Sequence, residues 1–286
     1  MNIHLLAIDP QNDFCDLPDA WCPVLNGQRL APALPVPGAH DDMVRLAGLI
    51  QSLGSHLTDI TVTLDSHPNL AIERPSLWRD ADNQPVPAFT VVTHADVLSG
   101  RYRPRFEADL VASQIARLES QGGQLMVWPE HCVTGTWGHT LHPQMTQALS
   151  EWECRHGRTA LKVRKGEYPW SEHYGVFVAD TPLDDVPSTQ FNLHLARRVT
   201  RQVDVLLVGG EASSHCVRAS IEQLLTAMES GRIPHMANTA RVILLSDCMS
   251  PVSGFEQTER DFIEQALTRG VHRMTATQAL STLSIS

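Results

Sequence analysis

Residues 203–217 of this chain read VDVLLVGGEASSHCV, and they decide its fold class. The apolar run Val203–Val208 predicts a buried strand, and a helical pattern with apolar residues on one face follows over Ser214–Glu229. Cys216 is therefore expected on a tight strand-to-helix turn, among free backbone N–H groups and at the positive end of a helix dipole. Both features favour the thiolate, which is the nucleophilic form of cysteine. A buried, inert cysteine is the alternative that this segment leaves open.

Length, charge and cysteine content limit the class of protein. A chain of 286 residues that is 42% hydrophobic is long enough for one α/β domain with a sizeable core. The formal net charge of −10 argues against a nucleic-acid partner, and no apolar run is long enough for a membrane helix. The N-terminal residues run directly into a predicted strand without signal-peptide features, and the six cysteines have no CxxC spacing. We therefore expect a cytoplasmic protein with reduced thiols.

Short apolar runs alternate with amphipathic stretches along the whole chain. This alternation predicts an α/β fold with a doubly wound parallel sheet and helices on both faces. The predicted strands are Ile3–Ile8, Asp59–Leu64, Phe89–Thr93, Gln124–Val127, Ala160–Val163, Val203–Val208 and Arg241–Leu245. The predicted helices are His40–Leu53, Phe106–Glu119, Gln144–Arg155, Thr189–Arg201, Ser214–Glu229 and Phe255–Thr268. Residues 68–124, rich in proline and charge, are interpreted as an elaborated loop insertion (a lid or an oligomer contact) within a single domain over residues 1–286.

Two further predicted strands end in residues suited to assist a thiol. Asp9 follows the first strand, where a carboxylate is well placed for general-base work, although Asp13 competes for that role and a helix-capping aspartate is the alternative. Lys165 ends another strand beside a glycine, so it is a better candidate than Lys162. A lysine near Cys216 would lower the pKa of the thiol and balance a developing anion. A solvated basic cluster is the alternative for the lysine.

A metal site is also indicated by the sequence. Asp65 and His67 end a predicted strand with side chains on one side, and His131 follows another strand. One carboxylate and two imidazoles suit zinc, manganese or iron with coordination positions left open. Two motifs about sixty residues apart become strong evidence only in a fold that brings them together. The other histidines are interpreted as solvated or structural, among them His139, His142 and His156.

Five segments, taken in order, resemble the isochorismatase-like cysteine hydrolases, and within them the nicotinamidases. The matching segments are Asp9-x-Gln11-Asn12-Asp13-Phe14, Asp65-x-His67-Pro68, Trp128-Pro129-x-His131-Cys132-Val133, Lys165-Gly166 and Gly210-Glu211-Ala212-Ser213-Ser214-His215-Cys216-Val217. The resemblance spans almost the whole chain. It implies the isochorismatase-like, Rossmann-like form of the α/β fold, and it implies a homo-oligomer.

The resemblance also implies roles for individual residues. It implies a catalytic triad and one divalent metal ion, most simply zinc, with iron or manganese as alternatives. The implied triad is Asp9, Lys165 and Cys216, and the implied metal ligands are Asp65, His67 and His131. Nicotinamidases often add a fourth ligand soon after the Asp-x-His motif, and Glu73 is the candidate for it in this chain, with Arg74 as its rival.

The same resemblance implies how a substrate would be held. A cis peptide bond between Glu211 and Ala212 would direct the backbone N–H groups of Ala212 and Cys216 into an oxyanion hole. Phe14 and Trp128 match positions that flank the substrate ring, and core packing is the alternative for both.

The implied reaction is hydrolysis of a small-molecule amide, with nicotinamide converted to nicotinate and ammonia through a thioester. The residues before Cys216 and the long insertion depart from the nicotinamidase pattern, so another aromatic or heterocyclic carboxamide is the alternative substrate. Other readings are a metal-free carbamoyl or ureido hydrolase, a non-catalytic binding protein, and a redox-sensing thiol protein in which Cys248 resolves Cys216. The candidate metal set argues against the first and third of these, and the intact triad argues against the second.

Overall fold

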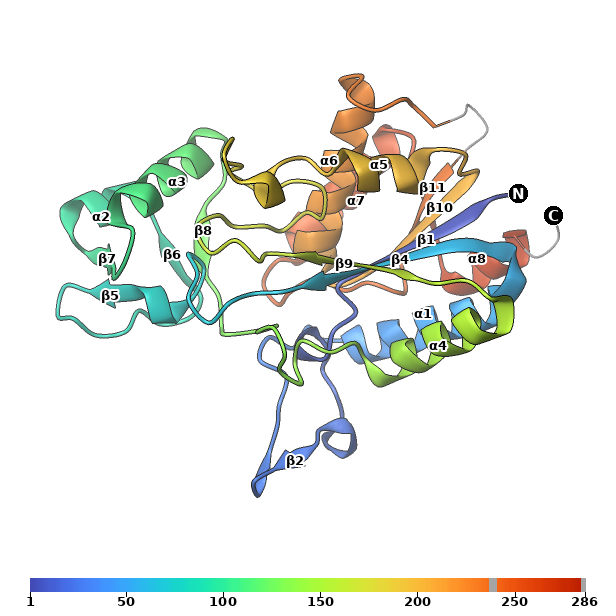
Figure 1. Ribbon diagram of the computed structural model, residues 1–286, viewed down its shortest axis with the longest axis horizontal. Coiled ribbons are helices and arrows are strands. Elements are labelled where there is room, and N and C mark those ends of the chain that lie inside the picture. The colour runs from blue at the N-terminus through green and yellow to red at the C-terminus, as the bar shows by residue number, and fades with distance from the viewer. Residues whose placement is uncertain (237–240, 284–286) are drawn as a thin grey trace.

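A sheet of six parallel strands runs through the computed structural model, which describes residues 1–236 and 241–283 (Figure 1). In spatial order the strands are β12 (His272–Met274), β11 (Arg241–Leu245), β10 (Val205–Gly210), β1 (Ile3–Ile8), β4 (Leu57–Asp65) and β9 (Leu161–Lys165). All neighbouring pairs are parallel. The sequence predicts five of these strands to within a few residues and misses β12, because its three residues are too few for a pattern.

The order of the strands creates a switch point beside β1. The chain moves from β1 outward to β4 and β9, and then returns to the other side of β1 for β10, β11 and β12. The direction of progress reverses between β1 and β10, and ligands of such sheets bind outside the carboxyl ends of the strands at this point. The topology therefore predicts a binding crevice where β1 and β10 end.

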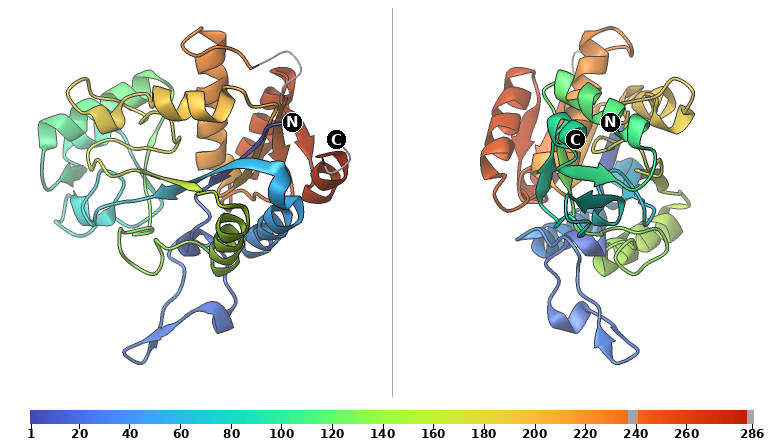
Figure 2. Two further views of the ribbon diagram at one scale, coloured as in Figure 1. Left: turned by 45° about the vertical axis from the view of Figure 1, so that its right-hand side comes forward. Right: turned by 90° about the vertical axis from the view of Figure 1, so that its left-hand side faces the viewer.

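Helices cover both faces of the sheet, which confirms the predicted doubly wound fold (Figures 1 and 2). Helices α1 (Ala39–Leu53), α4 (Pro143–His156) and α8 (Ala276–Leu283) pack on one face against residues such as Leu5 of β1 and Leu207 of β10. Helices α5 (Leu193–Thr200), α6 (Arg218–Glu229) and α7 (Glu256–Thr268) pack on the other against Leu6 and Val208. Successive residues of the strands are buried on opposite faces, as expected for a parallel sheet covered on both sides.

The segment predicted as a long loop contains regular structure of its own. It holds α2 (His94–Ser99), α3 (Ala108–Ser120) and an antiparallel pair of β5 (Trp78–Asp80) with β7 (Tyr102–Pro104). Its strand β6 (Thr90–Val92) pairs antiparallel with β8 (Leu125–Val127), which directly follows the segment. These elements enclose a separate apolar cluster that includes Trp78, Val111 and Ile115. The predicted strands Phe89–Thr93 and Gln124–Val127 and the predicted helix Phe106–Glu119 are thus present as β6, β8 and α3, but the two strands do not belong to the main parallel sheet. They pair with each other outside the main sheet, because their apolar faces are buried in the separate cluster.

A hairpin of β2 (Val24–Leu25) and β3 (Gln28–Arg29) projects from the body of the molecule (Figure 2). Within the described residues, no helix combines the length and the hydrophobicity that crossing a membrane requires.

Candidate active site

Four neighbouring strands of the sheet bring the predicted catalytic residues to one edge. Asp9 follows β1, Asp65 ends β4, Lys165 ends β9, and Cys216 comes shortly after the end of β10. All four side chains are buried. This edge is the switch point of the sheet, so residues from 9 to 216 along the chain converge where the topology predicts a crevice.

Lys165 is at the centre of this group. Its Nζ lies 2.9 Å from Asp65 Oδ1, 3.0 Å from Asp9 Oδ2 and 3.5 Å from Cys216 Sγ. Nζ also donates to the backbone oxygen of His173 at 3.2 Å, and only 3% of the residue is exposed. The ammonium group is therefore fixed between two carboxylates and a thiol.

Burial dominates the electrostatics of the thiol. It raises the pKa of Cys216 well above its usual range, and the nearby charge of Lys165 lowers that pKa only in part. The expectation that the surroundings favour the thiolate is thus wrong for the resting site, because the loss of hydration outweighs the lysine charge. Burial also raises the pKa of Asp9, with Lys165 acting in the opposite direction. For Lys165, burial lowers the pKa, but Asp65 and Asp9 together raise it well above its usual range, so the group stays an ammonium ion.

The backbone around Asp9 is shaped to present its carboxylate. Asp9 has a φ of 42°, which is uncommon for residues other than glycine, although aspartate adopts it more often than most. Thr63 fixes the residue twice, because its hydroxyl accepts from the Asp9 N–H at 2.9 Å and donates to Asp9 Oδ1 at 2.5 Å. At the facing end of β10, Gly210 has a φ of 121°, and a Cβ there would overlap the backbone of Ile8. The close approach of β10 to β1 thus requires glycine at this position.

The segment that carries Cys216 differs from the predicted helix. A π-helical turn over Ser213–Val217 precedes α6, so Cys216 lies in this turn and not in the first turn of an α-helix. The Val217 N–H bonds to the Ala212 carbonyl, and Ser213 N–H bonds to the Ser250 carbonyl at 2.9 Å. The peptide bond between Glu211 and Ala212 is cis, which confirms that expectation.

Asp65, His67 and His131 form a second group next to the first. Their ligand atoms all lie within 4.8 Å of one another, with His67 Nε2 2.8 Å and His131 Nε2 3.5 Å from Asp65 Oδ2. Burial lowers the pKa of His131 to about 4, so its imidazole is neutral. Burial alone would lower the pKa of His67 as well, but Asp65 and Glu73 raise it to about 9. A metal ion could take the place of that proton between the three groups.

The outer contacts of the two histidines fit a metal site. His67 Nδ1 lies 3.0 Å from Glu73 Oε1, and His131 Nδ1 lies 2.8 Å from the carbonyl oxygen of Pro129. The Nε2 atoms of both rings face Asp65, and an outer acceptor at Nδ1 is typical of metal-ligating histidines. At His131, Nδ1 also lies 3.0 Å from the donor Arg74 Nη1, so Pro129 is not its only partner. Glu73, expected as a fourth ligand, is not part of the group of three. Its Oε1 contacts Nδ1 of His67, the nitrogen that points away from Asp65, and lies 3.1 Å from Arg74 Nε. Glu73 therefore orients the His67 ring and is not itself in the ligand group.

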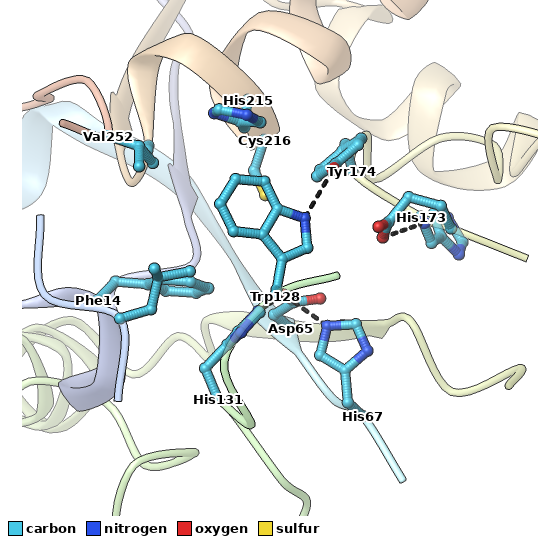
Figure 3. A pocket seen from close by; sticks show the side chains of 13 residues that line it. Phe14, Asp65, His67, Trp128, His131, His173, Tyr174, His215, Cys216 and Val252 are labelled. Carbon is cyan, nitrogen blue, oxygen red and sulfur yellow. Dashed lines mark hydrogen bonds and ion pairs between the residues drawn. The ribbon is translucent and has the colours of Figure 1, made fainter. Parts of the chain in front are cut away.

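Cys216 of the first group and all three members of the second line a small pocket that also has aromatic side chains in its wall (Figure 3). Phe14 and Trp128 line it and also pack in the apolar cluster on the α1 side, and the ring centroid of Phe14 lies 5.2 Å from that of His131. Trp128 Nε1 donates to the hydroxyl of Tyr174 at 2.8 Å, as the dashed line in Figure 3 shows. The remaining lining residues are Leu34, Asp65, His67, Glu172, His173, Tyr174, Ala212, His215, Cys216 and Val252.

The free space in this pocket is about 30 Å³, whereas a neighbouring cleft of about 410 Å³ lies beyond its aromatic wall. Trp128, Tyr174 and His215 line both spaces. A volume of 30 Å³ is room for about two water molecules. A ring-sized ligand therefore requires these side chains to move, and the cleft is the adjoining space into which they could open.

Sequence reasoning left rivals for several roles, and the contacts separate them. Asp13 accepts from the Cys132 N–H at 2.7 Å and the Ala33 N–H at 3.0 Å, so it ties two loops together. Lys162 is a surface residue paired with Glu153 at 3.2 Å. The first is a structural carboxylate and the second a solvated cation, and neither reaches the thiol.

The proposed redox partner of Cys216 is separated from it by the sheet. Cys248 belongs to the apolar cluster on the α1 side, and Cys216 to the cluster on the α6 side. All six cysteines lie in the described part of the chain, and none forms a disulfide there.

Several residues of the site were missed by sequence reasoning. Thr63 holds Asp9, and Gln11 accepts from the Asp65 N–H at 2.7 Å and donates to its carbonyl at 2.9 Å. Thr63 lies two residues before Asp65 on β4, so strand alternation could have placed it on the same face. Glu172 and Tyr174 lie in an irregular segment after β9, where no periodicity points to the pocket.

Comparison with known proteins gives structural matches only. No family model matches the chain, and no curated protein matches it in sequence. The structure resembles a yeast nicotinamidase with 20% identity, covering 95% of this chain and 99% of that one at a TM-score of 0.61. It also resembles the Pyrococcus horikoshii pyrazinamidase solved in complex with zinc, with 19% identity, 96% and 99% coverage and a TM-score of 0.51. An isochorismatase-like hydrolase from Alkaliphilus metalliredigens matches with 16% identity, 99% coverage of both chains and a TM-score of 0.50. The chain therefore has the isochorismatase-like α/β fold that the sequence predicts.

Proposed function

We propose that this protein is a metal-dependent cysteine amidohydrolase that converts nicotinamide to nicotinate and ammonia. The observation that carries the proposal is the placement of Lys165 Nζ within 3.5 Å of Cys216 Sγ and within 3.0 Å of Asp9 and Asp65, next to the pocket that Asp65 and Cys216 line. Nicotinamidases and pyrazinamidases are among the proteins that share the fold, which supports an amide as the substrate. An aromatic or heterocyclic carboxamide other than nicotinamide is the alternative substrate.

The first half of the reaction follows from the contacts of the thiol. Asp9 takes the proton of Cys216 while the Lys165 ammonium stabilises the thiolate, which is needed because burial opposes its formation. The thiolate attacks the amide carbonyl, and the backbone N–H groups of Ala212 and Cys216 stabilise the tetrahedral oxyanion. Asp9 returns the proton to the amide nitrogen, the C–N bond breaks, and ammonia leaves a thioester on Cys216.

In the second half of the reaction, a water molecule hydrolyses the thioester after ammonia has left. Asp9 removes a proton from a water molecule, which attacks the thioester carbonyl. The C–S bond breaks, the carboxylic acid leaves, and the proton returns to the sulfur. The net reaction is amide plus water to acid plus ammonia, and the protein is restored.

The group of Asp65, His67 and His131 would hold the metal ion. When bound, an ion such as zinc, iron or manganese would supply a Lewis-acid position for the ring nitrogen of the substrate. The relative solved in complex with zinc supports zinc as the first choice. Phe14 and Trp128 would pack against the ring, and movement of the wall shared with the larger cleft would admit it.

Two wider predictions accompany this proposal. Six unpaired cysteines support a reducing, cytoplasmic location. The homo-oligomer that the resemblance implies stays a prediction, to be checked by light scattering.

The experiment that tests the proposal is ammonia release from nicotinamide by the metal-loaded protein, with Cys216→Ala and Cys216→Ser beside it. We expect release by the native protein and a loss of several orders of magnitude in both variants, because a serine hydroxyl is much harder to ionise than a thiol. Near-normal turnover by Cys216→Ser would remove Cys216 as the nucleophile. If the folded native protein released no ammonia from any amide of a wide carboxamide panel, the proposed hydrolase activity would be refuted.

A further inference from the structure

A buried carboxyl group in the wall of the pocket has no role in the chemistry above. Glu172 lines the pocket and is 5% exposed. Its Oε1 accepts from the His173 N–H at 3.0 Å, whereas Oε2 has neither a hydrogen-bond nor an ion-pair partner among the described residues. Leaving a buried polar atom unpaired is energetically costly, so such atoms in native proteins call for an explanation.

A second unpaired atom lies on the next residue. His173 Nδ1 accepts from the Gly166 N–H at 3.4 Å, which leaves the ring proton on Nε2. Burial lowers the pKa of this imidazole to about 3, so the neutral form is present. Nε2–H has no acceptor among the residues that the structure describes, and His173 also lines the pocket. One carboxyl oxygen and one N–H donor, on consecutive residues that both line the pocket, therefore remain without a partner among the described residues.

The backbone holds both residues in position. The carbonyl of His173 accepts from Lys165 Nζ at 3.2 Å, and the carbonyl of Glu172 accepts from the Asp180 N–H at 2.9 Å. Asp180 Oδ2 in turn accepts from the Tyr174 N–H at 3.0 Å. The segment is thus fixed directly to the catalytic lysine, and such fixed groups recognise a ligand without a large loss of conformational entropy.

Glu172 is placed toward the metal-site end of the pocket. The charges of Glu73 and His67 are among those that act on its carboxyl group, together with that of Asp180. Glu172 is, however, outside the set whose ligand atoms come within 4.8 Å of one another. The structure therefore does not group Glu172 with the candidate metal ligands, although it lines the same pocket.

We propose that Glu172 and His173 form a specificity subsite that binds a hydroxyl group on the ring of the carboxamide substrate. A hydroxyl group suits both atoms at once, because it can accept from Nε2–H and share a hydrogen bond with the carboxyl oxygen in either protonation state. A methyl group of similar size would leave both atoms unpaired. The inference rests on the proposed amidohydrolase function and narrows its substrate class to hydroxylated aromatic carboxamides.

The test compares kcat/KM for nicotinamide, each of its monohydroxylated isomers and the matching methyl analogues. We expect at least one hydroxylated isomer to exceed both nicotinamide and its methyl analogue by about tenfold or more. Glu172→Ala should remove that preference, Glu172→Gln should keep part of it, and Glu167→Ala, an exposed carboxylate of the same segment, should leave it unchanged. A native protein that shows no hydroxyl preference, or a Glu172→Ala variant that retains it, would overturn the subsite.

Two further measurements distinguish absence of the subsite from absence of the hydrolase activity and from a role of Glu172 in metal binding. Binding of the same amides to Cys216→Ala reports on the subsite without turnover, and a protein that binds unsubstituted amides equally well lacks it, although it remains a candidate hydrolase. Absence of both binding and turnover for every amide would refute the proposed function and this inference together. Metal content of Glu172→Ala, measured by mass spectrometry, should match the native protein. Loss of metal with an equal loss of activity on all amides would assign Glu172 to the metal site.

Discussion

Replacing Lys165 by methionine tests the electrostatic reasoning about the site most directly. The substitution keeps an unbranched side chain of similar length but removes the ammonium that lies 3.0 Å from Asp9 and 2.9 Å from Asp65. All three side chains are almost fully buried, so water cannot replace the lost interaction. Breaking a buried ion pair in this way costs about 3–5 kcal/mol of unfolding free energy.

For Lys165→Met, we expect a loss of unfolding free energy at the lower end of that range. Burial already raises the pKa of Asp9, and loss of Lys165 would raise it further, so Asp9 can become neutral by taking up a proton. We therefore expect a loss of about 3 kcal/mol at neutral pH. With a urea m-value of about 3 kcal/mol/M, the midpoint of unfolding should fall by about 1 M.

The assay is urea unfolding followed by circular dichroism, with chelator present so that metal binding does not contribute. Asp9→Asn added to Lys165→Met should recover part of the loss, because it removes one of the two carboxylates left without a partner. A loss below about 1 kcal/mol would refute the view that Lys165 compensates two buried charges. So would a double variant no more stable than Lys165→Met.

Three other substitutions probe separate parts of the structure. Asp65→Ala should weaken metal retention by more than the roughly 10–100-fold that loss of an outer partner costs, with the fold intact by circular dichroism, and full metal occupancy would contradict the ligand assignment. Burial and the neighbouring Asp42 raise the pKa of Glu211 well above its usual range, so the folded protein binds a proton that the unfolded chain releases above about pH 4–5. Stability should fall as pH rises through this window, by up to about 1.4 kcal/mol per pH unit, and Glu211→Gln should flatten the slope in thermal unfolding curves at pH 5 and pH 8. Gly138→Ala should lower the melting temperature, because the new Cβ would overlap the carboxylate of Asp13, and an unchanged melting temperature would show that the loop yields without cost.

The sequence predicts the sheet and its catalytic edge well because both depend on local patterns. Strand β1 is identified over Ile3–Ile8 without error, since a continuous apolar run buried on both faces leaves little choice of bounds. Asp9, Asp65 and Lys165 could be chosen because they follow such runs directly. The geometry that joins them comes from strand order, which periodicity does not report.

Other features depend on contacts that no local pattern contains. The helix predicted to carry Cys216 begins with a π-helical turn, whose hydrogen bonds involve Ala212 and Ser250 outside the helix. The prediction that the surroundings lower the pKa of Cys216 was wrong, because the sequence reveals neighbouring charges more readily than the depth of burial. Glu73 was expected as a fourth metal ligand but contacts Nδ1 of His67 instead, because the tertiary fold sets which ring nitrogen it meets.

The carboxylate of Asp65 divides its two oxygens between the two halves of the site. Oδ1 contacts Lys165 at 2.9 Å, and Oδ2 faces His67 and His131. A change in one half is therefore expected to affect the other, since loss of His67, whose pKa is raised to about 9, would change the charge around Asp65 and so around the lysine. Substitutions in the metal set and in the triad should show strong epistasis, and a lineage of this fold that abandoned its metal would have to change residues on both sides of Asp65 together.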